Sequence, residues 1–227
     1  MISIENITKT YSQHKILENA SMEIPDGKII GIYGKSGIGK STIAKILCGV
    51  LDAERGSIYM DRELLYTAGS RYNRRLGIKI QMVYQQPYSS LDYNQKLIKG
   101  FYELIRYHKF AKDKKEADLL INSLLEEVGL EREILAHRPY QISGGEAQRI
   151  SIARSLLFHP RLLILDEATS MLDVSTQANV MALVRKVMEK SGGSVLLISH
   201  DKELVNYLCD QIYVFDKYQL KRKETEV

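Results

Sequence analysis

The sequence predicts an α/β protein in which a parallel sheet is flanked by helices. Near both ends of the chain, short apolar segments of strand length alternate with segments of helical periodicity. Such alternation is typical of a parallel sheet covered by helices. In between, residues 88–158 show mostly helical periodicity. We therefore expect one domain over 1–227, with a core and strand-rich subdomain formed by 1–87 and 159–227, and an inserted helical subdomain at 88–158.

The individual elements follow from local patterns. Alternating or continuous apolar residues, bounded by turn residues, predict strands. We expect them at 2–8, 15–24, 28–33, 57–60, 78–84, 162–165, 194–199 and 211–215. Helical periodicity predicts helices at 41–48, 95–107, 114–128, 146–157 and 177–189, and a short one after His200. The charged residues 221–227 are expected to be frayed.

The composition limits the classes of function. Of the 227 residues, 44% are hydrophobic and 26% are charged, which is typical of a globular protein with a sizeable core. The net charge of +4 is too small to predict nucleic-acid binding, and we expect no nucleic-acid partner. The basic clusters Arg71–Arg75 and Lys112–Lys115 are interpreted as solvated surface, although either could face phosphates or a membrane. No apolar run approaches the ~18 residues of a membrane-spanning helix, so we expect any membrane role to depend on partners.

A glycine-rich segment after the third expected strand fits the pattern G-x-x-x-x-G-K-[ST] for binding phosphates. Glycines let successive backbone N–H groups point at one phosphate, and the helix that follows turns its positive end toward the same charge. Lys40 is expected to neutralise the β- and γ-phosphates, and Ser41 to ligate Mg²⁺. The expected nucleotide-binding residues of this segment are Gly34, Lys35, Ser36, Gly37, Ile38, Gly39, Lys40, Ser41 and Thr42.

Two acids follow the apolar run at 162–165. Asp166 and Glu167 are therefore expected at the C-terminal end of a buried strand, which is where parallel α/β sheets bind ligands. Asp166 is a candidate ligand of Mg²⁺, and Glu167 is a candidate general base that polarises the attacking water. Together with the phosphate segment, the two acids predict nucleotide hydrolysis.

A second helix start of the anion-binding type precedes these acids. A small hydroxyl residue and two glycines open the helix expected at 146–157. Its candidate phosphate-binding residues are Ser143, Gly144, Gly145 and Glu146.

In this order, the motifs resemble those of the ATP-binding-cassette (ABC) ATPase family over essentially the whole chain. Ser143–Glu146 is similar to the family signature, in which Gln is usual where Glu146 stands. The resemblance implies a P-loop NTPase fold with a parallel-sheet RecA-like core, an N-terminal antiparallel β-subdomain and an inserted α-helical subdomain. It also implies that the protein binds ATP and Mg²⁺.

The resemblance assigns roles to further residues. Tyr11 resembles the aromatic residue that stacks on adenine, with a core tyrosine as the alternative. Gln85 is similar to the glutamine of the Q-loop, which senses Mg²⁺ and links to the partner. Asp173, which follows Met171 where a small residue is usual, resembles the acid of the D-loop. His200 is similar to the switch histidine that contacts the γ-phosphate.

The family resemblance also implies partners. A second ATPase subunit, either the same chain or a paralogue, is expected to pair head to tail, with each ATP between Lys40 of one chain and Ser143 of the other. The segment from Gln85 to Asp92 resembles that of oligopeptide, dipeptide and nickel importers, with Tyr93 where proline is usual. This implies transmembrane permease subunits, an extracytoplasmic binding protein, and a place at the cytoplasmic face of the membrane.

Two other functions remain open from the sequence. One is a soluble ABC ATPase that acts in translation, chromosome maintenance or repair, although the double cassette, long coiled coil or metal cluster usual in those proteins is not visible. The other is a regulatory nucleotide-binding module without turnover. The transported cargo is open between peptides, nickel and metal chelates.

Overall fold

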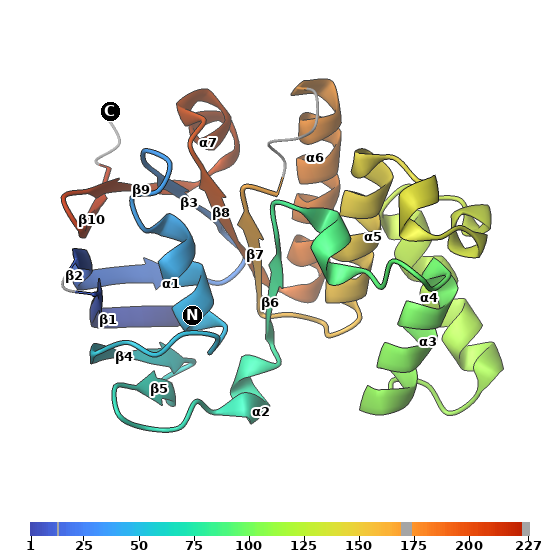
Figure 1. Cartoon of the computed structure of the whole chain (residues 1–227), viewed down its shortest axis with the longest axis horizontal. Coiled ribbons are helices and arrows are strands. Elements are labelled where there is room, and N and C mark those ends of the chain that lie inside the picture. Colours follow the sequence, from blue (N-terminus) through green and yellow to red (C-terminus); the bar gives the residue numbers. More distant parts are fainter. Residues whose placement is uncertain (13, 169–173, 224–227) are drawn as a thin grey trace. The chain divides into compact units, whose positions relative to one another are not determined.

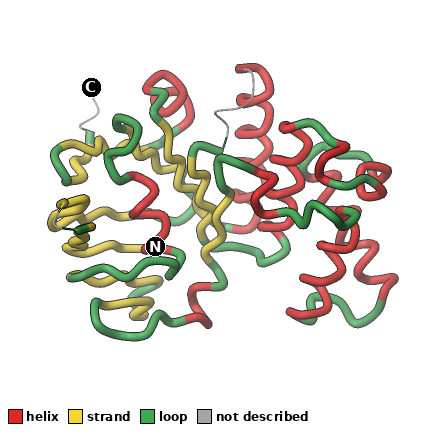
Figure 2. The backbone as a smooth tube through the Cα atoms, viewed as in Figure 1, coloured by secondary structure: helices red, strands yellow, loops and turns green. Residues whose placement is uncertain are grey.

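The computed structural model describes residues 1–12, 14–168 and 174–223, and the side chains of 174–176 are also left undescribed. By its internal contacts the chain divides into two compact units. The first comprises Met1–Met82, Arg161–Glu167 and Met188–Val227, and the second Val83–Pro160 and Ala168–Val187. Figure 2 shows that strands dominate the first unit and helices the second.

An antiparallel sheet forms the N-terminal part of the first unit (Figure 1). Its strands lie in the order β2-β1-β4-β5. Ile2, Ile4 and Ile7 of β1 are buried in the core, and Ile4 lies opposite Met22 of β2. Ile2 and Ile4 follow the alternation expected of a sheet with one face on the core, and an irregularity of the pairing between Ile4 and Ile7 returns Ile7 to the buried face. The strands are β1 (Ile2–Tyr11), β2 (His14–Ile24), β4 (Arg55–Met60) and β5 (Glu63–Thr67).

A six-stranded sheet carries the candidate site. Its order is β10-β9-β3-β8-β7-β6, with β3 parallel to both β8 and β9, β7 parallel to β8, and β10 antiparallel to β9. Every residue of β7 and β8 is buried, which explains why these strands read as continuous apolar runs. The strands are β3 (Ile29–Tyr33), β6 (Ile80–Val83), β7 (Leu162–Asp166), β8 (Ser194–Ser199), β9 (Gln211–Asp216) and β10 (Gln219–Arg222).

Besides the end of α6 (Val174–Ser191), the described part of the first unit contains three helices. They are α1 (Lys40–Leu47), the one-turn α2 (Arg74–Gly77) and α7 (Lys202–Leu208). The absence of a side chain at Gly31 of β3 allows α7 to pack closely, because a Cβ there would lie 2.5 Å from Val205 Cγ1.

The second unit is almost entirely helical. Asp113 caps the N-terminus of α4 by accepting a hydrogen bond from the backbone N–H of Glu116, which satisfies one of the free donors of a helix start. Its core is built around fully buried side chains such as Phe101 of α3 and Ile121 of α4. Its elements are η1 (Pro87–Ser90), α3 (Leu97–His108), α4 (Lys114–Glu127), η2 (Arg132–Ala136), η3 (Pro139–Gln141), α5 (Gly144–Leu156) and most of α6 (Val174–Ser191).

The predicted fold class is confirmed: a largely parallel sheet flanked by helices, an N-terminal antiparallel sheet and a helical region are all present. The prediction that 221–227 fray is wrong for Lys221 and Arg222. These residues lie in β10, where they pair with Val214 and Tyr213 of β9. Charged side chains obscured this strand because it lies at the edge of the sheet, where polar residues are tolerated.

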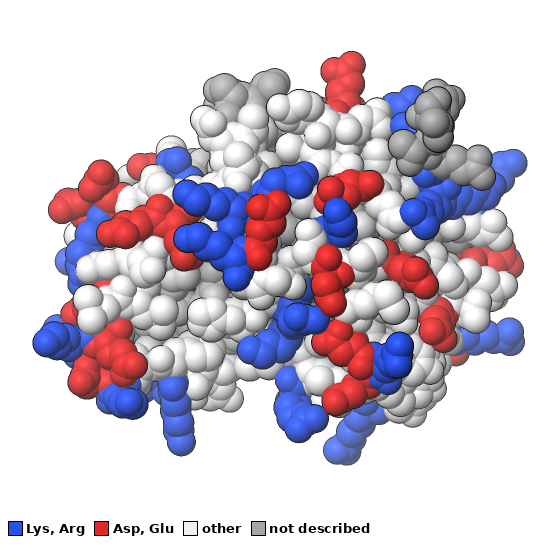
Figure 3. Space-filling model, turned by 180° about the vertical axis from the view of Figure 1, so that it is seen from behind, with Lys and Arg blue, Asp and Glu red and all other residues white. Residues whose placement is uncertain are grey.

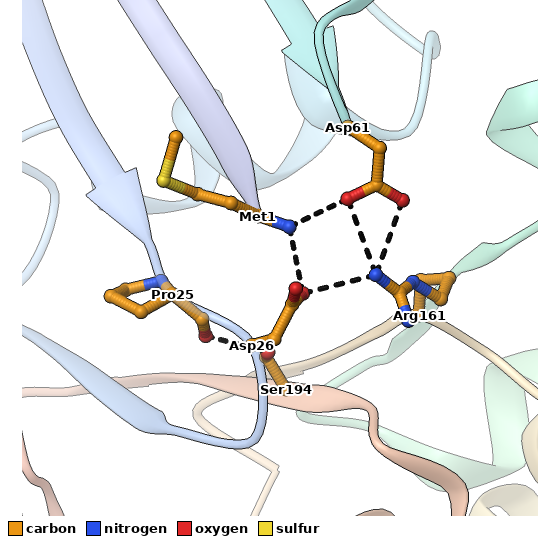
Figure 4. Close-up of polar contacts among 6 residues, drawn as sticks. All are labelled: Met1, Pro25, Asp26, Asp61, Arg161 and Ser194. Carbon is orange, nitrogen blue, oxygen red and sulfur yellow. Dashed lines mark hydrogen bonds and ion pairs between the residues drawn. The ribbon is translucent and has the colours of Figure 1, made fainter.

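A cluster of charges joins the loops at one end of the first unit (Figure 4). Arg161, which precedes β7, donates hydrogen bonds to both Asp26 and Asp61 at 3.1 Å. The amino group of Met1 lies 2.7 Å from each of the same two carboxylates. These bonds hold the pKa of Asp61 below its usual range, chiefly through the Met1 amino group.

Surface charges of opposite sign are interspersed on the face shown in Figure 3. Among the helices of the described residues, none has both the length and the hydrophobicity needed to cross a bilayer.

Candidate nucleotide-hydrolysis site

The phosphate segment lies between β3 and α1, as its pattern requires. Gly37 and Gly39 adopt φ values of 75° and 118°, in the left-handed region that favours glycine. At Gly39 there is also no room for a side chain, because its Cβ would lie 2.5 Å from Ile16 Cγ2 of β2. The two glycines therefore permit a tight curve of backbone next to the β1–β2 hairpin.

The start of α1 is open to an anion. Gly39 is the N-cap residue and contributes no side-chain hydrogen bond, and the first turn of the helix contains no acidic residue. The N–H groups of a helix start carry partial positive charge, which binds phosphate well. The geometry therefore suits the phosphates of a nucleotide.

The Lys40 side chain is buried inside this curve. It is only 4% exposed, and its Nζ donates hydrogen bonds to the carbonyl oxygens of Gly34 and Lys35, both at 2.9 Å. A buried ammonium needs such partners to offset the loss of water. It therefore places a positive charge inside the loop, where a phosphate would bind.

Ser41 and Asp166 come together although 125 positions separate them in the sequence. The Ser41 hydroxyl donates a hydrogen bond of 2.9 Å to Asp166 Oδ1 at the end of β7. Burial raises the pKa of the Asp166 carboxyl, and the neighbouring charge of Glu167 adds to this, while the Ser41 hydrogen bond lowers it. A hydroxyl and a largely buried carboxylate match the oxygen ligands that Mg²⁺ prefers, so these residues fit the ion.

Glu167 occupies a strained position. Its φ of 49° is in the left-handed region, which costs energy for a residue with a side chain. Its backbone N–H donates to Ile198 O of β8 at 2.9 Å, which holds this conformation in place. The carboxylate oxygen Oε1 lies 3.7 Å from Lys40 Nζ and 3.5 Å from His200 Nδ1. The candidate base is therefore close to both Lys40 and His200.

His200 is presented by a turn between β8 and α7. The Ser199 hydroxyl accepts from the backbone N–H of Asp201 at 3.0 Å, and Asp201 in turn caps α7 by accepting from Glu203 and Leu204. The His200 side chain is 53% exposed. A half-exposed imidazole held by such a turn can reach a ligand in front of Glu167.

Tyr11 lies at the end of β1, in the hairpin that packs against Gly39 through Ile16. It is 42% exposed, so it is not the core tyrosine that was the alternative. The Lys9 ammonium lies 5.5 Å from the centre of its ring. An exposed aromatic face beside a phosphate loop suits stacking on a base.

The other predicted residues lie in the second unit or outside the described residues. Gln85 is an exposed residue between β6 and η1. Ser143 is the N-cap of α5, where the Glu146 carboxylate accepts from the Ser143 N–H at 2.8 Å and from its hydroxyl at 2.7 Å. These bonds lower the pKa of Glu146. Asp173 is outside the described residues.

The two predicted phosphate-binding helix starts therefore differ. The start of α1 has neither a side-chain cap nor an acid, whereas that of α5 is closed by a capping box of Ser143 and Glu146. Gly144 leaves open space where a Cβ would be, so backbone near this start is accessible to a ligand.

Phe215 of β9 supports the phosphate loop and was missed in the sequence. A Cβ at Gly34 would lie 3.1 Å from Phe215 Cβ, and one at Gly39 would lie 3.4 Å from the tip of the Phe215 ring. From the sequence, Phe215 is interpreted only as part of an apolar strand. Its contact with the loop arises because β3 and β9 are neighbours in the sheet.

Comparison with known proteins gives a consistent result. The family model described as ABC transporter matches residues 17–170. The oligopeptide transport ATP-binding protein OppF of Streptococcus mutans is 34% identical over 219 residues, which cover 94% of this chain and 71% of that protein. The nickel import ATP-binding protein NikE of Escherichia coli K12 is 35% identical over 216 residues, covering 95% of this chain and 80% of that protein.

A third relative and two solved structures extend the comparison. The methionine import ATP-binding protein MetN of Clostridium tetani is 34% identical over 95% of this chain and 66% of its own length. The dimeric ATP-binding cassette MJ0796, solved in a post-hydrolysis state with ADP and Pi, has a TM-score of 0.85 at 28% identity and covers 99% of this chain and 98% of its own. cbiO1 of Clostridium perfringens shares the fold, with a TM-score of 0.82 at 24% identity, over 97% of this chain and 86% of its own.

Proposed function

The chain belongs to the ABC transporter family, and from this premise we propose that its Lys40, Ser41, Asp166, Glu167 and His200 form the site at which it hydrolyses ATP to drive transport. The protein is an ATP-binding-cassette ATPase of the importer type found among its relatives.

One observation carries the assignment of the site. The hydrogen bond of 2.9 Å between Ser41 and Asp166 joins the phosphate segment to the acidic end of β7. Both are at the C-terminal ends of parallel strands, where such sheets bind ligands. Mg²⁺ needs oxygen ligands such as those of Ser41 and Asp166, and a phosphate chain needs a positive charge such as that of Lys40.

Binding of ATP follows from the groups around the loop. The adenine would stack on Tyr11, which is exposed at the end of the neighbouring hairpin. The phosphates would lie against the N-terminus of α1 and the Lys40 ammonium. Ser41 and Asp166 would hold Mg²⁺, which neutralises phosphate charge when bound, and Gln85 is a further candidate ligand.

Hydrolysis requires a water to attack the γ-phosphorus. The Glu167 carboxylate would orient that water and accept its proton as the new P–O bond forms and the bond to the ADP oxygen breaks. His200 would donate a hydrogen bond to the γ-phosphate and stabilise the charge that spreads over its oxygens. The products are ADP and inorganic phosphate.

The Ser143 region is proposed to complete the site from a second ATPase subunit. The dimeric cassette structure of MJ0796 supports an ATPase pair. In a head-to-tail pair, the α5 start of one chain would meet the ATP held by Lys40 of the other, with Asp173 near the junction. The partner is either a second copy or a paralogue.

The remaining partners and the cargo are proposed from the relatives. OppF and NikE are named for oligopeptide transport and nickel import, and MetN for methionine import. The segment after Gln85 favours the first two. We expect the subunit to work at the cytoplasmic face of a membrane, bound to permease subunits and supplied by an extracytoplasmic binding protein. The cargo would be a peptide, nickel or a metal chelate.

The test of the site is a lysine substitution. Lys40→Ala should abolish Mg²⁺-dependent ATP hydrolysis and weaken ATP binding by ~1.5–3 kcal/mol, since a hydrogen bond to a charged group is lost. Lys202→Ala, which removes an exposed lysine of α7, is the control and should hydrolyse ATP at the wild-type rate. Normal hydrolysis by Lys40→Ala would place the site elsewhere.

A further inference from the structure

Lys40 and Glu167 face each other directly, although each has a separate proposed task. Lys40 Nζ lies 3.7 Å from Glu167 Oε1, and the two side chains are only 4% and 16% exposed. Opposite charges at this distance attract more strongly where water is largely excluded. We infer that this ion pair is an interlock, in which Lys40 restrains the base Glu167 until the phosphates of ATP draw Lys40 away.

The contacts of Lys40 support this competition. An ammonium has three donors, and two of those of Lys40 are directed at the carbonyl oxygens of Gly34 and Lys35. The Glu167 carboxylate lies 3.7 Å from the same ammonium and forms an ion pair with it. Phosphate oxygens entering the loop compete with Glu167 for the same positive charge. ATP therefore binds at the expense of this ion pair.

The position of Glu167 makes the restraint effective. The same oxygen, Oε1, lies within 4 Å of both Lys40 Nζ and His200 Nδ1. An oxygen engaged with these two groups is not free to orient an attacking water. The left-handed backbone of Glu167 is held by the hydrogen bond from its N–H to Ile198 O, so the side chain starts from a defined point next to Lys40.

This inference rests on the proposed function, since it requires that Lys40 binds phosphate and Glu167 acts as the base. Its consequence is that hydrolysis is coupled to correct seating of the phosphates. A water that reaches an empty site meets a base whose charge is already compensated. The ion pair also predicts that Glu167 weakens ATP binding in the wild-type chain.

ATP affinity measured by calorimetry in EDTA, where turnover is prevented, tests the interlock. Low protein concentration keeps the chain monomeric. Glu167→Gln should bind ATP about three- to tenfold more tightly than the wild type, because Lys40 is no longer shared. Glu203→Gln, which removes the same charge from the start of α7, is the matched control and should bind as the wild type does.

The decisive arm repeats Glu167→Gln in a Lys40→Met background. If Glu167 opposes ATP only by repelling its phosphates, the gain in affinity persists there, and the interlock is wrong. If it acts by holding Lys40, the gain disappears. An unchanged affinity of Glu167→Gln in the Lys40 background also contradicts the inference. Failure of the wild type to bind ATP at all would instead contradict the proposed function.

Thermal unfolding without nucleotide covers the case in which Lys40→Met binds ATP too weakly to measure. The losses of Tm in Lys40→Met and Glu167→Gln should not add, because each single change already breaks the pair. A double variant whose loss of Tm equals the sum of the two would overturn the inference.

Discussion

Each end of strand β7 carries a cluster of acidic and basic groups, but the two clusters differ in burial. At its start, Arg161 is held between Asp26 and Asp61, and these side chains are 36%, 53% and 52% exposed. At its end, Asp166 and Glu167 lie with Lys40 in a largely buried place. A buried charge lowers the stability of the folded chain unless an opposite charge or a ligand compensates it. The exposed cluster therefore joins loops of the fold, whereas the buried cluster contains the residues proposed to bind the nucleotide and Mg²⁺.

The pKa shifts at the two ends have opposite signs. The pKa of Asp61 is lowered by its hydrogen bonds, so its ionised form stabilises the folded chain above the unfolded-state pKa, and this contribution is lost as the pH falls. The pKa of Asp166 is raised by burial, so its ionised form costs stability at neutral pH. The functional end of β7 is therefore maintained at the expense of stability.

The largest effect is expected at Asp166, where a substitution should lower the rate of ATP hydrolysis without lowering the melting temperature. Asp166→Asn should reduce Mg²⁺-dependent ATP hydrolysis by roughly a hundredfold, because a charged ligand of the ion is lost. The melting temperature without nucleotide should stay the same or rise, because a buried charge is removed while the hydrogen bond from Ser41 can persist. Asp216→Asn, at the exposed end of β9, is the control for both the rate and the melting temperature. A clear fall in the melting temperature of Asp166→Asn would contradict the comparison.

Tyr11 gives the next largest effect, on nucleotide affinity. Tyr11→Ala should weaken binding by roughly 1–3 kcal/mol, the magnitude of base stacking on an aromatic ring. The loss should be similar for ATP and GTP, since stacking does not read a hydrogen-bond pattern. Tyr207→Ala, which removes a tyrosine that is 82% exposed, should leave both affinities unchanged. A loss confined to ATP would point to a specific contact instead.

The smallest effect is expected at the start of β7. Arg161→Ala should lower the stability by about 1 kcal/mol, or roughly 2–4 °C in Tm, with the hydrolysis rate of the folded enzyme unchanged. The difference from the wild type should shrink as the pH falls through the lowered pKa of Asp61, where that carboxylate is protonated. Arg75→Ala, which breaks a single exposed ion pair with Glu63, should have a smaller effect at every pH. An equal loss in both variants would mean that the cluster acts as isolated pairs.

The sequence revealed the functional end of β7 much better than the structural end. The apolar run before Asp166 predicts a buried parallel strand, and parallel strands bring their C-terminal ends to one edge, so the meeting of Ser41 with Asp166 could be expected. Asp26, Asp61 and Arg161 lie in three separate turns that carry no shared pattern. Their contact depends on the path of the loops in the folded chain, which local periodicity does not specify.

Strand prediction failed where burial was partial. β5 was missed because Glu63 and the 45% exposed Leu64 interrupt the apolar pattern of an edge strand. β10 was missed because its charged residues read as a frayed terminus. By contrast, β8 was predicted with the bounds that the structure shows, since all its residues are buried. The capping of α5 by Glu146 was likewise not foreseen, although the Ser-x-x-Glu spacing is its usual sequence signal.

The shared site between two chains is the central claim of the proposed mechanism, and one variant tests it most directly. Glu167→Gln removes the base but keeps the shape of the side chain, so ATP should bind without completing hydrolysis. Because ATP that binds only between two chains stabilises their pairing by mass action, this variant should shift toward a dimer in light scattering when Mg-ATP is added. Adding Ser143→Arg should reverse the shift by crowding the γ-phosphate. A monomer at saturating Mg-ATP, both alone and with the paralogous subunit present, would contradict the shared site.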